Sequence, residues 1–178
     1  RRTGGTFILV THSQEEAITM SDRIVLMRAG GIEQVGTPRE LFASPATEFA
    51  ARFMGVENIL SGTLDHLGEG VARIRVGDTV LAGRPVGDVA ALRPGAPAFA
   101  AFRAEHLRPG PEPSANAFRG ETRPGLYKGR FQDVPFSTPV GELVARLAEE
   151  PVSLPPEVQL SVAPEHCLIG AVGRDATA

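Results

Sequence analysis

The chain has 178 residues, of which 42% are hydrophobic and 22% charged, which is ordinary for a globular protein of one or two small domains. Its formal net charge is -3 and no stretch is dense in lysine or arginine, which argues against a nucleic-acid-binding surface. The single cysteine excludes an internal disulfide framework and fits a reducing compartment, and the apolar runs are too short to span a membrane as a helix.

The first element is an apolar run that ends on a histidine. Residues 6–11 are apolar throughout, which predicts a strand covered on both faces, and His12 follows directly. Ser13 and Glu16 have the spacing of a capping box, which predicts a helix to about Met20. Because helix N-termini attract anions, an imidazole here can contact a phosphate. The alternative is a histidine that only ends the strand and bonds a backbone carbonyl.

A hairpin and two short helices are predicted next. The apolar runs 23–28 and 32–36 are separated by Ala-Gly-Gly at 29–31, which can supply the positive φ angles of a tight turn. The sequence Thr-Pro-Arg-Glu at 37–40 is a second capping box, with proline at the first helical position. A further helix is expected over about 46–54, where Phe and Ala residues recur at helical spacing.

From about Glu57 the sequence changes to short apolar runs separated by glycine and proline, which is typical of a small β-barrel or sandwich. A weak internal repeat is present. Residues 58–62 resemble 116–120, and residues 104–107 resemble 164–168, at nearly equal offsets. We expect two related halves, each a set of strands that closes with a Glu-His turn. The predicted strands cover 71–76, 79–82, 97–102, 116–122, 126–134, 140–147 and 158–163.

Several segments occur together in an order known from one protein family. In the first part they are 8–17 (ILVTHSQEEA), 21–27 (SDRIVLM) and 31–38 (GIEQVGTP), followed by Leu41-Phe42 and Pro45-Ala46. Over about residues 6–55 the chain thus resembles the end of the ATP-binding subunit of an ABC importer. The second part is similar to the family's transport-associated OB domain, TOBE, at 58–62 (NILSG), 102–107 (FRAEHL) and 162–166 (VAPEH).

The resemblance implies a fold in two parts. Residues 1–56 would be an α/β remnant, the end of a P-loop nucleotide-binding domain. Residues 57–178 would form an all-β, OB-like TOBE barrel with a regulatory role, in two related halves at 57–112 and 115–172.

For His12 the resemblance implies a defined role. The family's histidine at this place is the switch-loop residue, which contacts the γ-phosphate of ATP held between two subunits and helps to orient the attacking water. An imidazole suits this role because one nitrogen can donate to a phosphate oxygen while the backbone holds the other. The family usually has aspartate next, and here the residue is Ser13. Both are good N-caps, but the negative charge is missing.

The function implied is that of an ATP-hydrolysing importer subunit, which couples ATP binding and hydrolysis to solute uptake. ATP and Mg²⁺ would be the cofactors of the full-length protein. Its partners would be a second ATPase subunit, the transmembrane permease subunits and, indirectly, a solute-binding protein, at the cytoplasmic face of the cell membrane. The chain begins with Arg1 rather than Met, so we expect a fragment.

We do not expect the fragment to act alone. The glycine-rich phosphate loop with its lysine, the signature segment and the Asp-Glu pair of the family are not in this sequence. Phosphoryl transfer depends on positioning and on charge neutralisation by lysine and metal. The fragment by itself is therefore expected neither to bind ATP tightly nor to hydrolyse it.

The sequence of the second part is also compatible with other functions. A free-standing module that binds small oxyanions is the main alternative, with backbone amides around 61–63 and 119–120 as candidate contacts. A metal site is not expected, because the candidate ligands lack close spacing and Glu-His turns can simply end strands. OB barrels can bind oligonucleotides, but one Tyr, no Trp and a slightly acidic chain argue against this. The metal candidates were Glu105, His106, Glu165, His166 and Cys167, the last of which is also expected to be a small core residue.

Overall fold

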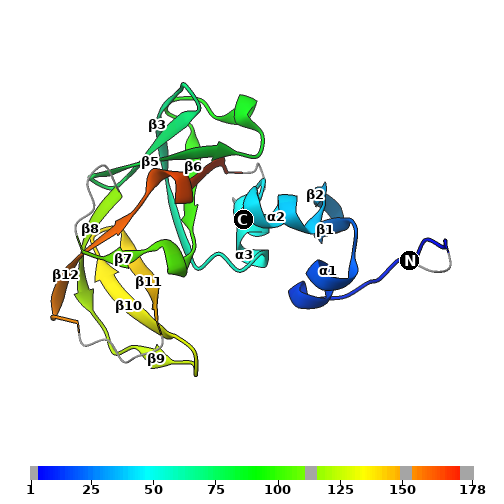
Figure 1. Cartoon of the computed structure of the whole chain (residues 1–178). Helices are drawn as coiled ribbons and strands as arrows, with labels where there is room; N and C mark the ends of the chain where they lie inside the picture. Colours follow the sequence, from blue (N-terminus) through cyan, green and yellow to red (C-terminus); the bar gives the residue numbers. More distant parts are fainter. Residues whose placement is uncertain (1–3, 111–115, 149–153, 173–178) are drawn as a thin grey trace.

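The computed structural model describes residues 4–110, 116–148 and 154–172. A small N-terminal unit with three helices and a hairpin lies beside a larger β region (Figure 1). Within this unit, α2 and α3 lie next to the β region, and α1 and the hairpin lie farther from it. None of the helices in these described ranges is long and apolar enough to cross a membrane.

The N-terminal unit is built around the predicted hairpin. Its two strands pair antiparallel, and Ala29 and Gly30 turn the chain with positive φ angles. Side chains from the hairpin and from two of the helices form one buried cluster: Ile24, Leu26, Leu41, Ala50 and Met54. The elements are α1 (Gln14–Met20), β1 (Ile24–Arg28), β2 (Gly31–Gly36), α2 (Pro38–Ala43) and α3 (Glu48–Phe53).

The two predicted capping boxes differ in the structure. The box of α2 is complete, because Thr37 and Glu40 each accept a hydrogen bond from the other's backbone N–H. The bond from the Thr37 backbone lowers the pKa of Glu40. At α1 only half of the box forms: Ser13 accepts from the backbone N–H of Glu16, but the Glu16 carboxylate accepts from the hydroxyl of Thr11. Both helices still begin where the sequence predicts.

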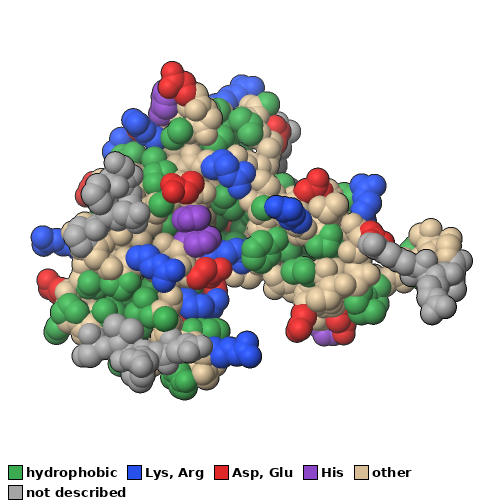
Figure 2. Space-filling model, viewed as in Figure 1, with side chains coloured by type: hydrophobic (Ala, Val, Ile, Leu, Met, Phe, Trp, Pro, Cys, Tyr) green, Lys and Arg blue, Asp and Glu red, His purple; other side chains and the backbone are tan. Residues whose placement is uncertain are grey.

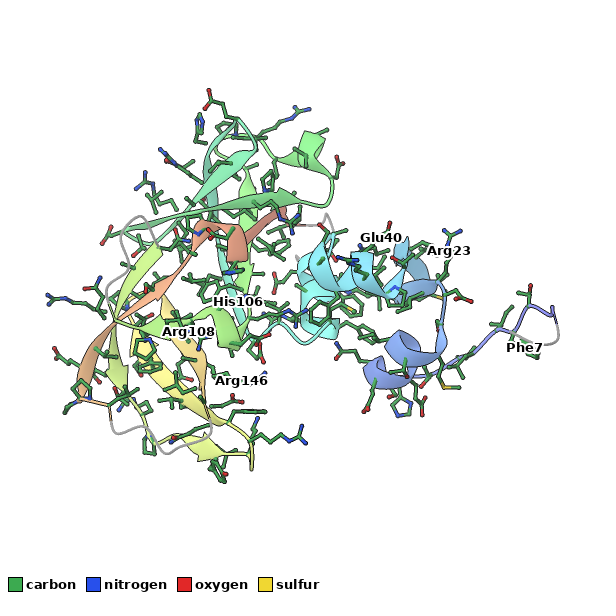
Figure 3. All side chains as sticks on the ribbon, in the orientation of Figure 1. Phe7, Arg23, Glu40, His106, Arg108 and Arg146 are labelled. Carbon is green, nitrogen blue, oxygen red and sulfur yellow. The ribbon has the colours of Figure 1, made fainter. Side chains whose placement is uncertain are left out.

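The strand predicted over residues 6–11 is not formed. Residues 4–11 have no strand structure, and the side chains of Phe7 and Ile8 are 82% and 90% exposed. Figure 3 shows Phe7 on an extended segment far from the β region. A strand needs a neighbour that satisfies its backbone N–H and C=O groups, and none of the described residues pairs with this run. The apolar composition predicted a strand, but without a neighbouring strand to pair with, these residues do not form one in this structure.

The β region contains the expected closed barrel. Its five strands follow the order β13-β5-β4-β3-β6, and β13 closes the ring by pairing with both β5 and β6. This confirms an OB-like barrel in the second part of the chain. The strands are β3 (Asn58–Gly68), β4 (Val71–Val76), β5 (Thr79–Val86), β6 (Pro97–Phe102) and β13 (Leu168–Ala171).

A second sheet lies against the barrel, in the order β11-β10-β8-β12-β7, with β9 paired to β10. One buried apolar cluster spans both sheets, and within it Phe102 of the barrel stacks on Phe118 of the second sheet at 6.0 Å. The strands are β7 (Arg108–Pro109), β8 (Asn116–Thr122), β9 (Leu126–Tyr127), β10 (Gln132–Thr138), β11 (Gly141–Leu147) and β12 (Glu157–Val162). The 3-10 turns are η1 (Val89–Ala91), η2 (Ala104–His106) and η3 (Pro164–His166).

Most predicted strands appear at or near their expected bounds, with two differences. The run 126–134 was expected to be one strand, but it divides into β9 and the start of β10, and Gly129 between them has a positive φ. The strands β3, β7 and β13 were not among the predicted runs: β7 and β13 are too short to carry a periodic signal, and β3 was indicated only by the repeat segment at 58–62.

The strands form two sets that follow the same order along the chain. Strands β3, β4, β5 and β6 are followed by η2 and β7, and strands β8, β10, β11 and β12 are followed by η3 and β13. The last strand of each set pairs with the other set, since β7 pairs with β12 and β13 pairs with β5 and β6. Each set therefore depends on the other for one of its strands.

Two buried asparagines at equivalent places link the sets. The side chain of Asn58, 2% exposed, donates to the carbonyl of Val144 at 2.9 Å and accepts from its N–H at 2.7 Å. Asn116, 6% exposed, makes the same pair of bonds with Ala82, at 2.8 and 2.7 Å. Each asparagine thus binds the backbone of the other set, where a buried polar group would otherwise be unsatisfied.

We predict that Asn58→Ala and Asn116→Ala each lower the free energy of unfolding by about 2–4 kcal/mol, because each removes two buried hydrogen bonds and leaves backbone groups unpaired. Urea unfolding of the chain measures this. The matched control is Ser61→Ala, an exposed side chain on the same strand as Asn58, which should change stability by less than about 0.5 kcal/mol. Equal effects of Asn58→Ala and Ser61→Ala would contradict the prediction.

Candidate functional site

The structure places His12 on exposed chain between Thr11 and Ser13, directly before the N-cap of α1. Its imidazole therefore stands at the start of a helix, as the sequence predicts, although the strand expected before it is not formed. Figure 1 shows α1 on the side of the N-terminal unit that faces away from the β region. His12 is thus not brought together with the Glu-His turns.

The two Glu-His turns meet each other. The rings of His106 in η2 and His166 in η3 stack at a centroid distance of 3.9 Å and an angle of 17°. Figure 2 shows histidine atoms near the middle of the visible face of the β region, between acidic and basic side chains, and further histidine atoms at the upper and lower edges of the molecule. The exchange of β7 and β13 brings the turns together, because each turn leads into a strand of the other set.

The surroundings of His106 influence its charge state. Burial lowers the pKa of His106, and the charges of His166, Arg103 and Arg108 lower it further, while Glu105 acts in the opposite direction. The Nδ1 atom of His106 is buried and has no hydrogen-bond partner among the described residues. The neutral form of His106 is therefore favoured in the folded chain.

Two arginines attach the β region to the N-terminal unit. Arg84 of β5 donates to the carbonyl of Ala43 at 2.6 Å and to the hydroxyl of Ser44 at 3.0 Å. Arg103 donates to the carbonyls of Met54 at 3.1 Å and Phe42 at 3.3 Å. These acceptors lie at the carboxyl ends of α2 and α3, where carbonyls lack helical partners and the helix dipole is negative. The arginines therefore supply the missing donors.

Packing supports the same junction. The guanidinium of Arg103 lies over the ring of Phe42 at 3.6 Å, and burial lowers the pKa of Arg103. In α3, Ala50 faces the cluster of the hairpin, while the next residue, Ala51, packs against the barrel. A Cβ on Gly87 would come within 2.2 Å of the Ala46 carbonyl, so glycine permits the close approach of the two parts.

A third arginine, Arg146, lies beside the Glu-His turn of η2 and pairs with several carboxylates. Arg146 forms ion pairs with Asp133 and Glu57, both at 2.8 Å, and with Glu105 at 3.6 Å, and Figure 3 shows it near His106 and Arg108. The hydrogen bond to Asp133 raises the pKa of Arg146. Burial acts to raise the pKa of Asp133, but the bonds from Arg146 and Lys128 outweigh it and the pKa is lowered.

Arg84 and Arg146 occupy equivalent positions in the two sets. Each lies two residues after the residue that an interlocking asparagine binds, Ala82 or Val144. Their partners differ, because Arg146 pairs with carboxylates whereas Arg84 binds the end of α2. Sequence reasoning missed all three arginines. One signal was available for Arg103: it stands where the second copy of the repeat has Ala163.

Two pockets are lined by residues that the sequence indicated as candidate ligand contacts. A pocket of about 290 Å³ at the junction is lined by Arg84, Arg103, Glu105, His106, Glu165 and His166, together with apolar side chains that include Phe42. A wider groove of about 660 Å³ on the second sheet includes Arg119 and Gly120, beside two glutamates and two hydroxyl side chains.

The candidate anion contacts at 61–63 are corrected by the structure. These residues lie inside β3 and pair with β6, so they are not a glycine-rich turn with free amides. A Cβ on Gly62 would come within 2.2 Å of the Arg75 carbonyl, which explains the glycine by close strand packing. The segment 119–120 also lies in a strand, β8.

The other sequence candidates have structural explanations. Cys167 is buried in the core that spans both sheets, and burial raises its pKa to about 12. The thiol therefore belongs to the core, as expected. Within the described part of the chain, no three His, Cys, Asp or Glu side chains lie where they could hold a metal ion together.

Comparison with known proteins gives several matches. The chain is 41% identical over 173 residues to the spermidine/putrescine import ATP-binding protein PotA of Rubrobacter xylanophilus, covering 93% of this chain and 45% of the relative. It is 40% identical over 139 residues to PotA of Thermobifida fusca, covering 72% and 34%, and 36% identical over 154 residues to PotA of Acidothermus cellulolyticus, covering 84% and 39%. The chain thus spans less than half the length of these relatives. No protein-family model matches it.

Among solved structures, the chain is similar to the cytoplasmic molybdate-binding protein ModG with molybdate bound. The TM-score is 0.57 at 19% identity, and the match covers 66% of this chain and 97% of that one. At this identity the likeness shows the fold alone, which is that of the TOBE-like β region.

We predict that Arg84→Ala and Arg103→Ala each loosen the N-terminal unit. Loss of hydrogen bonds from a charged donor costs about 1.5–3 kcal/mol, so the amides of α2 and α3 should exchange with solvent about tenfold faster or more. Hydrogen exchange followed by mass spectrometry measures this, with β4 amides as an internal reference. Arg73→Ala, an exposed arginine of β4, is the matched control. Unchanged exchange in α2 and α3 would show that the arginines do not hold the junction.

We predict a pH dependence from the stacked histidines. The lowered pKa of His106 means that its contribution to stability is present above the unfolded value of 6.5 and is lost as the pH falls through the folded pKa. His106→Phe keeps an aromatic ring without the titration, so the wild type should lose stability relative to this variant between pH 8 and pH 5. Thermal unfolding measures the difference. His66→Phe, at an exposed site, should follow the wild type; a pH-independent difference between His106→Phe and the wild type would refute the prediction.

Proposed function

We propose that this chain, which is homologous to the carboxy-terminal region of PotA ATP-binding subunits of ABC importers, is the end of such an ATP-hydrolysing subunit. Residues 1–56 are proposed to be the end of the P-loop nucleotide-binding domain. Residues 57–178 are proposed to be its regulatory TOBE domain, in two related halves at 57–112 and 115–172.

The observation that carries this proposal is the extent of the similarity. The match to the Rubrobacter xylanophilus relative covers 93% of the chain, and so includes both the N-terminal unit and the β region. The two-set order of the strands and the equivalent asparagines support the proposed halves. The full-length subunit would couple ATP binding and hydrolysis, with Mg²⁺, to solute uptake.

His12 is the proposed catalytic residue of this region. Its imidazole is exposed and stands directly before α1, so it is accessible to a nucleotide bound by the full-length subunit. There it would contact the γ-phosphate of ATP and help to orient the attacking water, which is the kind of positioning on which phosphoryl transfer depends. Ser13 supplies the N-cap bond of the helix in place of the family's usual aspartate.

The solute and partners follow from the relatives. Because these are named spermidine/putrescine import proteins, we propose that the transported solute is a polyamine. The partners would be a second ATPase subunit, the transmembrane permease subunits and, through them, a solute-binding protein. The subunit would then be peripheral at the cytoplasmic face of the cell membrane.

A free-standing oxyanion-binding module has less support. The likeness to ModG concerns the fold, and residues 61–63 are strand residues without a turn. The groove at 119–120 contains Glu121 and Glu157 in a direct cross-strand pair, which disfavours an anion there.

The experiment is His12→Ala in the full-length subunit assembled with its permease. We expect ATP turnover to fall by about tenfold or more, because a positioned imidazole at the phosphate contributes on the order of 10²–10⁴-fold in catalysis. Spermidine-stimulated ATPase activity and spermidine uptake in vesicles measure this. His66→Ala, an exposed histidine of the β region, is the control and should leave both unchanged. Undiminished turnover and uptake with His12→Ala would overturn the proposed role.

A further inference from the structure

The junction pocket of about 290 Å³ lies where the N-terminal unit and both strand sets meet. The N-terminal unit contributes Phe42 and Ala43, the first set contributes Arg84 and Arg103, and η3 of the second set contributes His166. A ligand in this pocket would contact all three parts of the chain at once.

The two arginines of the pocket have no direct ion-pair partner among the described residues. Neither Arg84 nor Arg103 forms an ion pair within 4.0 Å with any described residue, and their recorded hydrogen bonds go to carbonyls and one hydroxyl. Arg103 is partly buried, and the charges of Glu105 and Glu57 offset only part of the cost of its burial, whereas Arg84 is exposed. A guanidinium also has more N–H donors than these bonds use. Each arginine can therefore still donate to a ligand.

Two stacked histidine rings also line the pocket. Burial favours the neutral form of His106, and its protonation would place a further positive charge on the wall of the pocket. The groups that face the pair are Arg103, Arg108 and Glu105. An anion in the pocket would favour this protonation, because an opposite charge stabilises the imidazolium form.

Two carboxylates also line the pocket, and they act differently. Glu105 forms an ion pair with Arg146 at 3.6 Å, which partly neutralises it, although its Oε2 atom is buried without a hydrogen-bond partner among the described residues. Glu165 is exposed, so its charge is hydrated and screened. The pocket thus has two guanidiniums without a direct ion pair, one partly neutralised carboxylate, Glu105, and one carboxylate at the rim, Glu165, that opposes an anionic ligand.

We propose that the junction pocket binds a small anion that carries a phosphate or carboxylate group, with Arg84 and Arg103 as its donors. The site differs from the segments 61–63 and 119–120, because it is formed only where the β region meets α2 and α3. The same guanidiniums would then bind both the ligand and the carbonyls of Phe42 and Ala43. Binding would therefore alter how firmly the N-terminal unit is held.

The test uses the 178-residue chain and NMR signals of the histidine rings. Inorganic phosphate and, in a separate arm, citrate are titrated at constant ionic strength set with chloride. We expect saturable shifts of the His106 and His166 signals and none of the exposed His66 signal. Saturation with phosphate alone or with citrate alone would support the site and assign its ligand class. Saturation with both would make it a general anion site.

Variants give the direction of the effect. Arg84→Lys keeps the charge but loses the planar fork, and should weaken phosphate binding by about tenfold. Glu165→Gln removes the opposing carboxylate without touching the junction, and should strengthen binding severalfold. Arg73→Ala should have no effect. The proposal is overturned if the His106 and His166 signals do not respond saturably to either anion, or if Glu165→Gln fails to strengthen binding. That result would leave the proposed ATPase role of His12 untouched.

Discussion

The structure of the β region depends on the exchange of the last strand between its two sets. The strand β7, which follows η2 of the first set, completes the second sheet by pairing with β12. The strand β13, which follows η3 of the second set, closes the barrel by pairing with β5 and β6. The exchange forces η2 and η3 to pass close to each other, which is why His106 and His166 stack. The asparagines at equivalent places, Asn58 and Asn116, bind across the same boundary. A single apolar core then forms from both sets, and neither can be removed without exposing it.

The same arrangement prepares the junction with the N-terminal unit. Arg84 and Arg146 stand at equivalent positions in the two strand sets, but of these two only Arg146 pairs with carboxylates. Arg84 instead joins Arg103 in binding the carboxyl ends of α2 and α3. The symmetry of the two sets is thus broken where the helices dock. A movement of α2 or α3 must either break these hydrogen bonds or carry the barrel with it. This gives a physical basis for communication between the N-terminal unit and the β region.

Local signals in the sequence predicted much of the fold. Capping boxes at Ser13 and Thr37 marked the starts of α1 and α2, and runs such as 97–102 matched whole strands, because these signals concern neighbouring residues. The strand at 6–11 was wrong here, since apolar composition cannot supply the neighbour that a strand needs. The repeat indicated two Glu-His turns but not their stacking, which follows from the exchange of β7 and β13. Of the arginines that bind helix carbonyls, Arg84 leaves no pattern in the sequence and Arg103 leaves only a difference between the two copies of the repeat, so the junction emerged only from the structure.

The central claim is that the two strand sets form one cooperative body through their exchanged strands. Native-state hydrogen exchange in increasing denaturant tests this most directly, because it reports the opening free energy of each amide. The amide of Ala82 in the barrel and that of Val144 in the second sheet each donate to the asparagine of the other set. We predict that both amides exchange with the same opening free energy, equal to that of global unfolding. Exchange of one through a separate, lower-energy opening of its own sheet would contradict the account.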